Sequence, residues 1–387
     1  MLPLILLGLM PATTLGTAAL NWLALIPWRR NRHEPWPEQA RRLWPVVVAA
    51  QSTIWILPLL TIFALALLRP GTSIWALFGT GIAALAGALA GTLPLNREVF
   101  PRLGWAELVR QCGIGFCLRL LLWVVLGGAA VAMPERFGWS ASALGAAVVA
   151  LQFFWARSGW LRLGRPLGLF VPAPERLQRI VAGVESRMGI ACRGVWVIRL
   201  GLCQALALPL SRELAFSDRL LEVMSDEEIA AICAHELGHL TESRGTLLLR
   251  LVRGMAFLPW IFIVPFLHTF GALGFYLPLL ATLLVPRATA AFVQRLETRA
   301  DRIAMANEAD GGVYARALLR LSEDNLTPVV FPGKGLTHPH TYDRVLAAGV
   351  TPDFPRPKAP AKMAWHGRLL AGALGLLLAI FAMQQIG

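Results

Sequence analysis

Residues 225–240 read SDEEIAAICAHELGHL, and this stretch decides how the middle of the chain folds. Ser225 can accept a hydrogen bond at the start of a helix, and Glu228, three residues later, can complete a capping box. The residues that follow are therefore predicted to form one helix. Because residues four apart share a face of a helix, His235 and His239 present both imidazoles to the same point.

Two histidines at this spacing, with Glu236 beside them, form the H-E-x-x-H pattern of a catalytic zinc site. Glu236 would lie next to the open coordination position, where it can act as the general base. Position 245 holds a glycine, which excludes the arrangement with a third histidine six residues further on. The third ligand must come from elsewhere in the chain.

The best candidate for that ligand is Glu297, in the segment RLETRADRIA at 295–304. Asp301 follows one helical turn later, where its carboxylate can accept a hydrogen bond from a ligand histidine and fix the tautomer of the ring. Alone, this pair would be an ordinary solvated helix face. Together with H-E-x-x-H it predicts one Zn²⁺ per chain.

The composition places this site in a membrane protein. The 387 residues are 56% hydrophobic and only 15% charged, which soluble domains rarely sustain. The net charge of +13 comes mostly from arginines in short loops between apolar runs, a pattern that fits membrane topology better than nucleic-acid binding. We therefore expect the lipid bilayer, and no nucleic acid, among the partners.

Apolar runs of about 20 residues predict eight membrane spans. The last three of these spans are a hairpin of two and one short final span. Glu297 can reach the histidines only if the chain returns to the side of the membrane that it left, so the uncharged stretch at 254–285 is predicted to be a hairpin of two spans. The final run, at 369–383, is short but can cross once. The first five spans are predicted at 2–27, 44–68, 73–95, 113–133 and 139–156.

The basic loops predict the topology. The loops after the first, third and fifth spans are rich in arginine, so by the positive-inside rule they face the cytoplasm, and the N-terminus lies outside. We expect a multi-pass protein of a bacterial inner (cytoplasmic) membrane whose site faces the cytoplasm. The predicted fold is mainly α, a polytopic helical bundle with a cytoplasmic α+β zincin-type domain that the transmembrane hairpin splits.

This reading predicts five regions in order. Residues 1–156 form the N-terminal membrane region, and 157–247 form the zincin core with the site helix. Within that core, an amphipathic helix begins near Pro174, and GVWVIRL, QALALPL and RELAFSD are short strands. Residues 248–290 form the hairpin, 291–362 carry the third ligand on a polar helical stretch at 292–321, and 363–387 form the last span.

The five cysteines are interpreted as reduced thiols, because they show neither an even disulfide framework nor the C-x-x-C spacing of a zinc ribbon. They are Cys112, Cys117, Cys192, Cys203 and Cys233.

Three segments together resemble the gluzincin membrane proteases, the family that includes CAAX prenyl protease 1 and the heat-shock protease HtpX. They are LSRELAFSDRLLEVMSDEEIAAICAHELGHL, LETRADRIA and THPHTYDRV. The resemblance covers roughly residues 170–345. It implies the same zinc ligands, His235, His239 and Glu297, with Glu236 as catalytic base and Asp301 behind the ligands.

The resemblance also implies functional residues that spacing alone does not indicate. His338 and Arg344 match a histidine-proline pair and a downstream arginine near the family's site, which implies that they bind substrate or stabilise an oxyanion. Gln204 stands where the family commonly has asparagine, before Ala205. These two residues begin a strand that is either a substrate-binding edge or an apolar core strand.

The predicted function is a zinc-dependent endopeptidase of membrane-protein processing or quality control, which acts on peptides or membrane proteins. Two other classes stay open. A membrane sensor of the β-lactam receptor type also carries H-E-x-x-H among its spans, but it normally has an external sensing domain, and few residues follow the last span here. A catalytically silent membrane scaffold could also retain the motif. Oligomeric state and substrate specificity are outside what these residues indicate.

Overall fold

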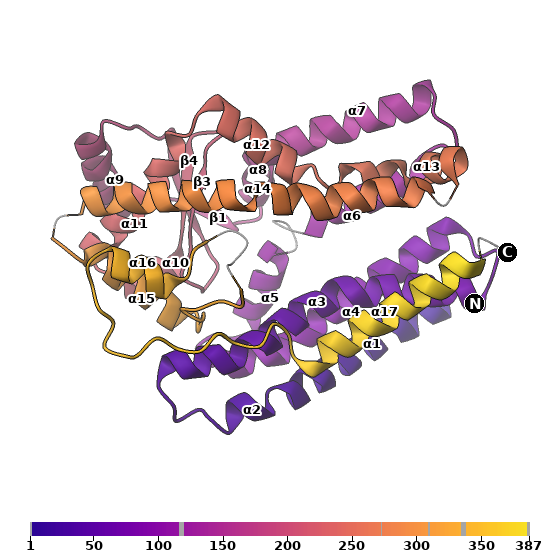
Figure 1. The fold of residues 1–387 in the computed structure, drawn as a ribbon, viewed down its shortest axis with the longest axis horizontal. Helices are drawn as coiled ribbons and strands as arrows, with labels where there is room; N and C mark the ends of the chain where they lie inside the picture. The colour runs from indigo at the N-terminus through magenta and orange to yellow at the C-terminus, as the bar shows by residue number, and fades with distance from the viewer. Residues whose placement is uncertain (1, 116–119, 272, 309, 334–337, 385–387) are drawn as a thin grey trace.

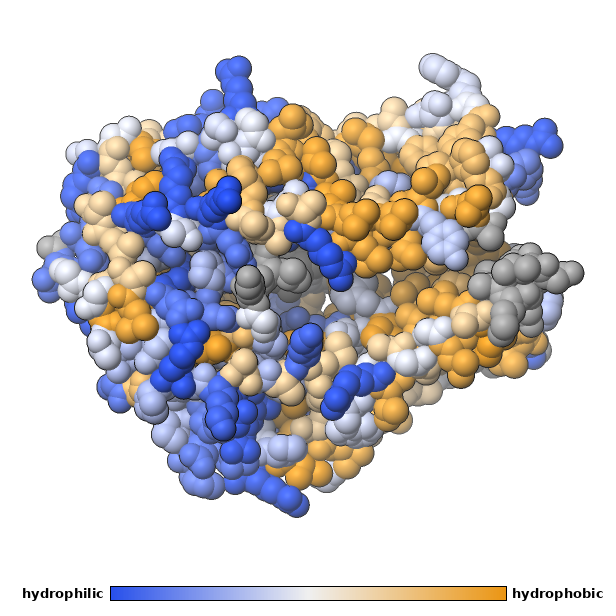
Figure 2. Space-filling model, viewed as in Figure 1, coloured by the Kyte–Doolittle hydropathy of each residue, from blue (hydrophilic) through white to orange (hydrophobic). Residues whose placement is uncertain are grey.

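The computed structural model describes residues 2–115, 120–271, 273–308, 310–333 and 338–384. The chain is mainly helical and has one small sheet. Long helices occupy one end of the molecule, and an α+β region occupies the other (Figure 1). Hydrophobic side chains cover much of the helical end in the view of Figure 2, and hydrophilic ones gather over the α+β end. This division agrees with a membrane region joined to a polar domain.

The first group of long helices is formed by the two ends of the chain. Helices α1 (Leu2–Ala24), α3 (Trp36–Leu68), α4 (Ile74–Val99) and α17 (Trp365–Gln384) lie side by side, with the short α2 (Ile26–Arg29) between the first two (Figure 1). A Cβ atom on Gly91 of α4 would lie 2.6 Å from Thr17 Cβ of α1. Small residues of this kind let two helix backbones approach closely.

The second group follows in sequence. It contains α5 (Trp105–Gly115), α6 (Leu121–Ala132) and α7 (Trp139–Phe154), which continues through a π-helical turn, η2 (Trp155–Gly159), into α8 (Trp160–Gly164). The part of the predicted fourth span at 116–119, with Cys117, lies outside the described residues. Cys112, Cys192, Cys203 and Cys233 are free thiols.

Four helices of the described chain are long and apolar enough to cross a membrane: α3, α4, α7 with its continuation to Gly164, and α14 (Leu273–Ala306). A fifth span is possible if α12 (Arg244–Gly254) and the apolar segment Leu258–Phe270, which meet at a bend of 42°, cross as one. Helix α6 and residues 365–380 of α17 are shorter apolar helices. The membrane character is therefore supported, whereas eight spans stays a prediction.

The α+β region is built on a four-stranded sheet in the order β1-β2-β4-β3. Strands β2 (Gly194–Ile198), β3 (Ala205–Leu208) and β4 (Glu213–Ser217) confirm the three predicted strands, and β1 (Phe170–Pro172) is an addition. Among the described residues, β3 pairs with β4 alone and is antiparallel to it, so β3 is an edge strand of this sheet.

Helices cover this sheet and make the main core. Helix α9 (Glu175–Met188), which follows Pro174 as predicted, joins α10 (Asp218–Val223) and α11 (Asp226–Leu240). The core contains buried side chains of α9, β4, α11 and α15 (Val313–Asp324). Helix α16 (Thr341–Ala347) packs against α15.

The chain folds back on itself over the stretch where a hairpin is predicted. The chain leaves the α+β region along α12, the 3₁₀ turn η3 (Leu258–Phe262) and α13 (Ile263–Phe270), and it returns along α14 (Figure 1). Two predicted domain boundaries, 247/248 and 290/291, fall inside α12 and α14, because both arms of the hairpin continue as helices of the α+β region.

The polar stretch predicted to be helical at 292–321 is not one helix. Helix α14 ends at Ala306 and α15 begins at Val313. Gly312 separates them with a φ of +84°, a left-handed conformation that favours glycine.

Candidate metal centre

Helix α11 positions the two histidines, and its start is fixed as predicted. Ser225 Oγ accepts a hydrogen bond from Glu228 N at 3.3 Å, while Glu228 Oε2 accepts one from Ser225 N at 2.9 Å. The second half of α11 is wholly buried. The rings of His235 and His239 lie with centroids 5.0 Å apart. The helix therefore presents both imidazoles on one face, inside the protein.

Helix α14 supplies the acidic residues from the far arm of the hairpin. Glu297 and Asp301 are 5% and 6% exposed and lie where α14 packs against α11. At Gly238 of α11, a Cβ atom would lie 3.3 Å from Ile303 Cδ1 and 3.5 Å from Ala300 Cα. The absence of a side chain at Gly238 therefore lets α14 come close to the histidines.

His235, His239 and Glu297, which we call the donor cluster, meet at one point. One ligand atom from each lies within 4.8 Å of the others. His235 Nε2 is 3.6 Å from Glu297 Oε2, and His239 Nε2 is 3.7 Å from Glu297 Oε1. Two ligands of a tetrahedral zinc ion, each about 2.1 Å from it, stand about 3.4 Å apart. The spacing therefore fits zinc.

A second observation also fits a cation at this point. Glu297 Oε2 is buried and has no hydrogen-bond partner among the described residues, although His338 Nδ1 lies 2.8 Å from it at an ion-pair distance. A buried carboxylate oxygen without a hydrogen bond is costly unless another positive group satisfies it. Two imidazoles and one carboxylate form the donor set of a catalytic zinc site.

The outer nitrogen of His235 faces hydrogen-bond partners behind the donor cluster. Its Nδ1 is 3.1 Å from Asp301 Oδ1 and 2.8 Å from the hydroxyl of Tyr314, a fully buried residue of α15. Tyr314 in turn donates to Asp301 Oδ1 at 2.6 Å. A proton on Nδ1 satisfies the carboxylate, which leaves the lone pair of Nε2 directed at the donor cluster.

Arg344 completes this arrangement from α16. Its Nε and Nη2 donate to the two oxygens of Asp301 at 2.9 and 2.7 Å, and Nη2 also donates to the Tyr314 hydroxyl at 2.8 Å. The Asp301 carboxylate is thus held by an arginine and a tyrosine while it faces His235. The structure places Arg344 behind the ligands, in contact with Asp301.

His239 has a corresponding partner, which the sequence reasoning missed. Its Nδ1 lies 2.8 Å from Glu242 Oε1, and the Glu242 side chain is only 1% exposed. Arg250 of α12 donates from Nε to Glu242 Oε2 at 2.6 Å. Both histidines therefore turn Nδ1 to a carboxylate that an arginine holds, and both turn Nε2 to the same centre.

The pKa of His235 reflects these neighbours. Burial by itself lowers the pKa of this imidazole, but the hydrogen bonds with Asp301 and Glu297 outweigh burial and raise the pKa to about 9 in the metal-free protein. A cluster that attracts a proton this strongly is also suited to a metal cation, which competes for the same lone pair.

The remaining predicted residues of the site lie around this centre. Glu236 is 9% exposed and stands next to His235 on α11. The His338 side chain is half exposed, and it is brought to Glu297 as described above. The structure thus gathers Glu236, Asp301 and His338 at the donor cluster.

Gln204 and Ala205 lie at the start of the edge strand. Gln204 N donates to Ser217 Oγ at 2.9 Å, and Gln204 O accepts from Ser217 N at 2.8 Å. Both residues are partly buried. Helix α11 packs against β3, so this strand runs beside the helix that carries the histidines.

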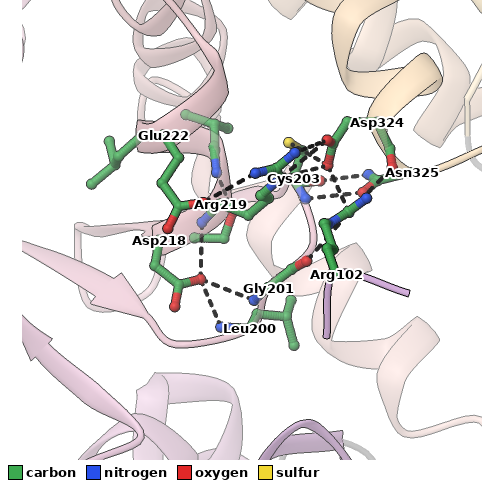
Figure 3. A network of polar contacts seen from close by, with 12 residues as sticks. Arg102, Leu200, Gly201, Cys203, Asp218, Arg219, Glu222, Asp324 and Asn325 are labelled. Carbon is green, nitrogen blue, oxygen red and sulfur yellow. Dashed lines mark hydrogen bonds and ion pairs between the residues drawn. The ribbon is translucent and has the colours of Figure 1, made fainter. Parts of the chain in front are cut away.

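A separate set of polar residues anchors the segment before β3, and we call it the clamp network: Arg102, Cys203, Arg219, Asp324 and Asn325 (Figure 3). The Asn325 amide bonds both backbone groups of Cys203, accepting from N at 2.9 Å and donating to O at 2.7 Å. Asp324 accepts from Arg102 at 2.9 Å and from Arg219 at 2.6 Å. The network therefore joins the loop after α4 and the end of α15 to the edge strand.

Three functional candidates were missed, and each had a different signal. Glu242 stands three residues after His239, a spacing that places it near the histidine ring. Arg250 has no such signal, because it depends on how α12 turns after Thr241. Tyr314 is separated from His235 by 79 residues, and only the packing of α15 on α11 joins them.

Residues 174–349, from α9 to α16, match the model of peptidase family M48. The match supports the gluzincin family that includes CAAX prenyl protease 1 and HtpX. The match confirms the resemblance drawn from the motifs. The family is zinc-dependent, which agrees with the donor cluster. No curated protein matches the chain.

Proposed function

We propose that the chain is an integral membrane zinc endopeptidase that hydrolyses peptide bonds in peptides or membrane proteins, in membrane-protein processing or quality control. The observation that carries the proposal is the donor cluster, in which both histidines direct Nε2 at Glu297 while carboxylates hold Nδ1. The family match of residues 174–349 supports the peptidase class.

His235, His239 and Glu297 would hold the zinc ion. When bound, zinc polarises a peptide carbonyl and lowers the pKa of coordinated water to about 7. Glu236, which follows His235 on α11, accepts the proton of the attacking water and passes it to the leaving amine. Asp301 and Glu242 keep the histidine rings oriented.

The two residues carried over from the family receive different roles. The His338 side chain is half exposed and stands 2.8 Å from a Glu297 oxygen, so it is placed to contact a bound substrate. Arg344 contacts Asp301 and Tyr314, which supports a positioning role through Asp301. Gln204 and Ala205 are proposed to bind substrate backbone at the strand edge.

The test of the proposed function is Glu236→Gln in the full chain, purified in detergent. A general base contributes about 10²–10⁴-fold to rate, so cleavage should fall by that factor while zinc stays stoichiometric by elemental analysis. Undiminished hydrolysis by the variant would defeat the proposal. Wild-type protein without stoichiometric zinc would favour the silent scaffold.

Eight spans and a cytoplasmic site are part of this proposal. The proposed spans are the predicted ones, at 2–27, 44–68, 73–95, 113–133 and 139–156, the two of the hairpin at 254–285, and the last at 369–383. Support comes from ion pairs between the predicted cytoplasmic loops and the peptidase region: Arg102 with Asp324 and Arg165 with Glu213. Arg29 and Arg32 likewise pair with Glu98 at the end of α4. The three basic loops therefore gather at one end of the helices, which the positive-inside rule assigns to the cytoplasm.

Reporter fusions after Pro134 and after Gly164 check this topology. We expect the first reporter outside and the second inside the cytoplasm of a bacterial cell. A reporter after Gly164 that is active only outside would overturn the cytoplasmic site.

A further inference from the structure

The free edge of β3 offers backbone groups to a bound chain. In an antiparallel ladder, residues that bond the partner strand alternate with residues whose N–H and C=O point away. Gln204 bonds Ser217 on β4, so Ala205 and Ala207 direct their backbone groups to the free edge. A peptide can add here as a further strand, beside the helix that carries the donor cluster.

A cavity of about 240 Å³ lies at the end of this edge. It is formed where the end of β3 and the turn after it meet α12 and the end of α7. Ala207, which faces the free edge, lies on the cavity wall. A strand bound along β3 would therefore reach this cavity with one of its side chains.

The cavity is also close to the donor cluster. Arg250 lines its wall, and the guanidinium of Arg250 donates to Glu242, which contacts the Nδ1 of His239. Arg250 Nη2 also lies 3.3 Å from His239 Nδ1, so one side chain separates the cavity from a proposed zinc ligand. A substrate side chain in the cavity would belong to a residue near the bond that is cut.

The chemistry of the wall selects an apolar group. Leucine and methionine side chains form much of the lining: Leu208, Leu210, Leu247, Leu251 and Met255. Gln152 of α7 contributes one amide, and the Arg250 charge is already paired with Glu242. The volume is below the roughly 300–1,000 Å³ of pockets that hold a whole small-molecule ligand, but it can hold one large side chain.

We infer that this cavity is the pocket that sets the cleavage preference of the protein, and that it takes a large apolar side chain such as leucine, methionine or phenylalanine next to the scissile bond. The inference rests on the proposed peptidase function and names the substrate class of that same site. The wall comes from three segments, at 152–156, 207–210 and 247–255, which only the fold brings together.

Gly254 provides a direct test. It lines the cavity at the end of α12, and a Cβ atom there would meet no atom within 4 Å, so the backbone has room for the side chain that Gly254→Leu adds at the cavity wall. The full chain in detergent is incubated with a peptide library that varies each position around the cut. The pocket position is the peptide residue next to the scissile bond whose side chain enters the cavity. For peptides with leucine, methionine or phenylalanine at this position, kcat/KM should fall at least about tenfold. Peptides with alanine there should change less than about twofold.

A second variant and a control keep the test decisive. Leu251→Ala enlarges the cavity and should shift the preference toward phenylalanine and tryptophan. Val252→Phe also enlarges an apolar side chain of α12, but Val252 is 46% exposed and lies off the cavity wall, so its profile should match wild type. Zinc content reports whether each variant is folded.

The outcomes separate the two proposals. If Glu236→Gln cleaves the library as well as wild type does, the peptidase function itself is wrong. If Glu236→Gln is inactive but wild type shows no apolar preference, the pocket is wrong. The pocket is also wrong if Gly254→Leu lowers every peptide equally, or if neither Gly254→Leu nor Leu251→Ala changes the profile.

Discussion

The donor cluster and the clamp network are both built from charged side chains, and they differ in how completely those side chains are paired. In the clamp network, Asp324 is matched by Arg102 and Arg219, and Asn325 satisfies both backbone groups of Cys203. In the donor cluster, Glu297 keeps a buried oxygen that has only the ion-pair contact with His338, and both imidazoles direct a nitrogen at the same point.

This difference separates a structural network from a site. A fully paired network holds segments together, because each charge already has its partner and gains nothing from a ligand. A buried carboxylate oxygen that lacks a hydrogen bond gains from a further positive group. Around the donor cluster, the second layer of Asp301, Tyr314 and Glu242 is itself well paired, so the incomplete bonding is confined to the centre.

The sharpest way to test this contrast is to disturb the second layer without touching a ligand. Tyr314→Phe removes the hydroxyl that contacts His235, Asp301 and Arg344. Outer partners of metal ligands typically contribute about 10–100-fold to metal affinity. We expect a loss of that size in zinc affinity, measured by competition with a chelator of known strength, together with slower cleavage.

Tyr342→Phe is the matched control for this variant. Tyr342 is also a buried tyrosine next to the site region, at 8% exposure, but its hydroxyl makes no hydrogen bond within the described chain. Its zinc affinity should equal that of wild type. Equal affinities for Tyr314→Phe and wild type would mean that the hydroxyl does not orient His235.

The clamp network should respond in the opposite way, by losing stability and keeping zinc. Asn325→Ala leaves the N–H and C=O of Cys203, which is 2% exposed, without their partner. An unpaired buried group costs about 1–3 kcal/mol. Thermal unfolding in detergent should shift to lower temperature, and KM should rise because β3 begins two residues later.

The exposed neighbour Glu323 supplies the control, since Glu323→Ala changes the same stretch of α15 outside the network. It should leave both the unfolding temperature and KM close to wild type. A loss of zinc in Asn325→Ala at unchanged stability would contradict the division between the two clusters.

The same contrast shows how far the sequence could predict this molecule. Helix α11 was predictable down to its capping box, because the spacing of Ser225 and Glu228 and of His235 and His239 reports local geometry. Glu297 and Asp301 were found because they are one helical turn apart and a zinc site needs a third ligand. The hairpin followed from the same requirement.

What could not be predicted depends on contacts between distant elements. Tyr314 lies in an ordinary amphipathic helix, and only the packing of α15 on α11 brings it to His235. The predicted domain boundaries near 248 and 290 fall inside α12 and α14, because hydropathy changes along these helices while each helix continues. The composition of a segment indicates whether it lies in lipid or in water. The ends of a helix depend instead on where its backbone hydrogen bonds stop.

The smallest expected effect concerns the pH dependence of the clamp network. Burial alone would raise the pKa of Asp324, but hydrogen bonds from Arg219 and Cys203 and the charges of Arg102 and Arg219 hold the pKa below its ordinary value. A carboxyl whose pKa is lowered on folding stabilises the protein above its unfolded pKa of about 3.9, and this contribution is lost as the pH falls through the folded pKa. Asp324→Asn removes the titrating group. When the pH is lowered by roughly three units, from about 6 to about 3, the unfolding temperature of Asp324→Asn should therefore fall less than that of wild type. Parallel curves for the two proteins would show that Asp324 gains no stability from its arginines, and the clamp network would then resemble an exposed ion pair rather than a structural anchor.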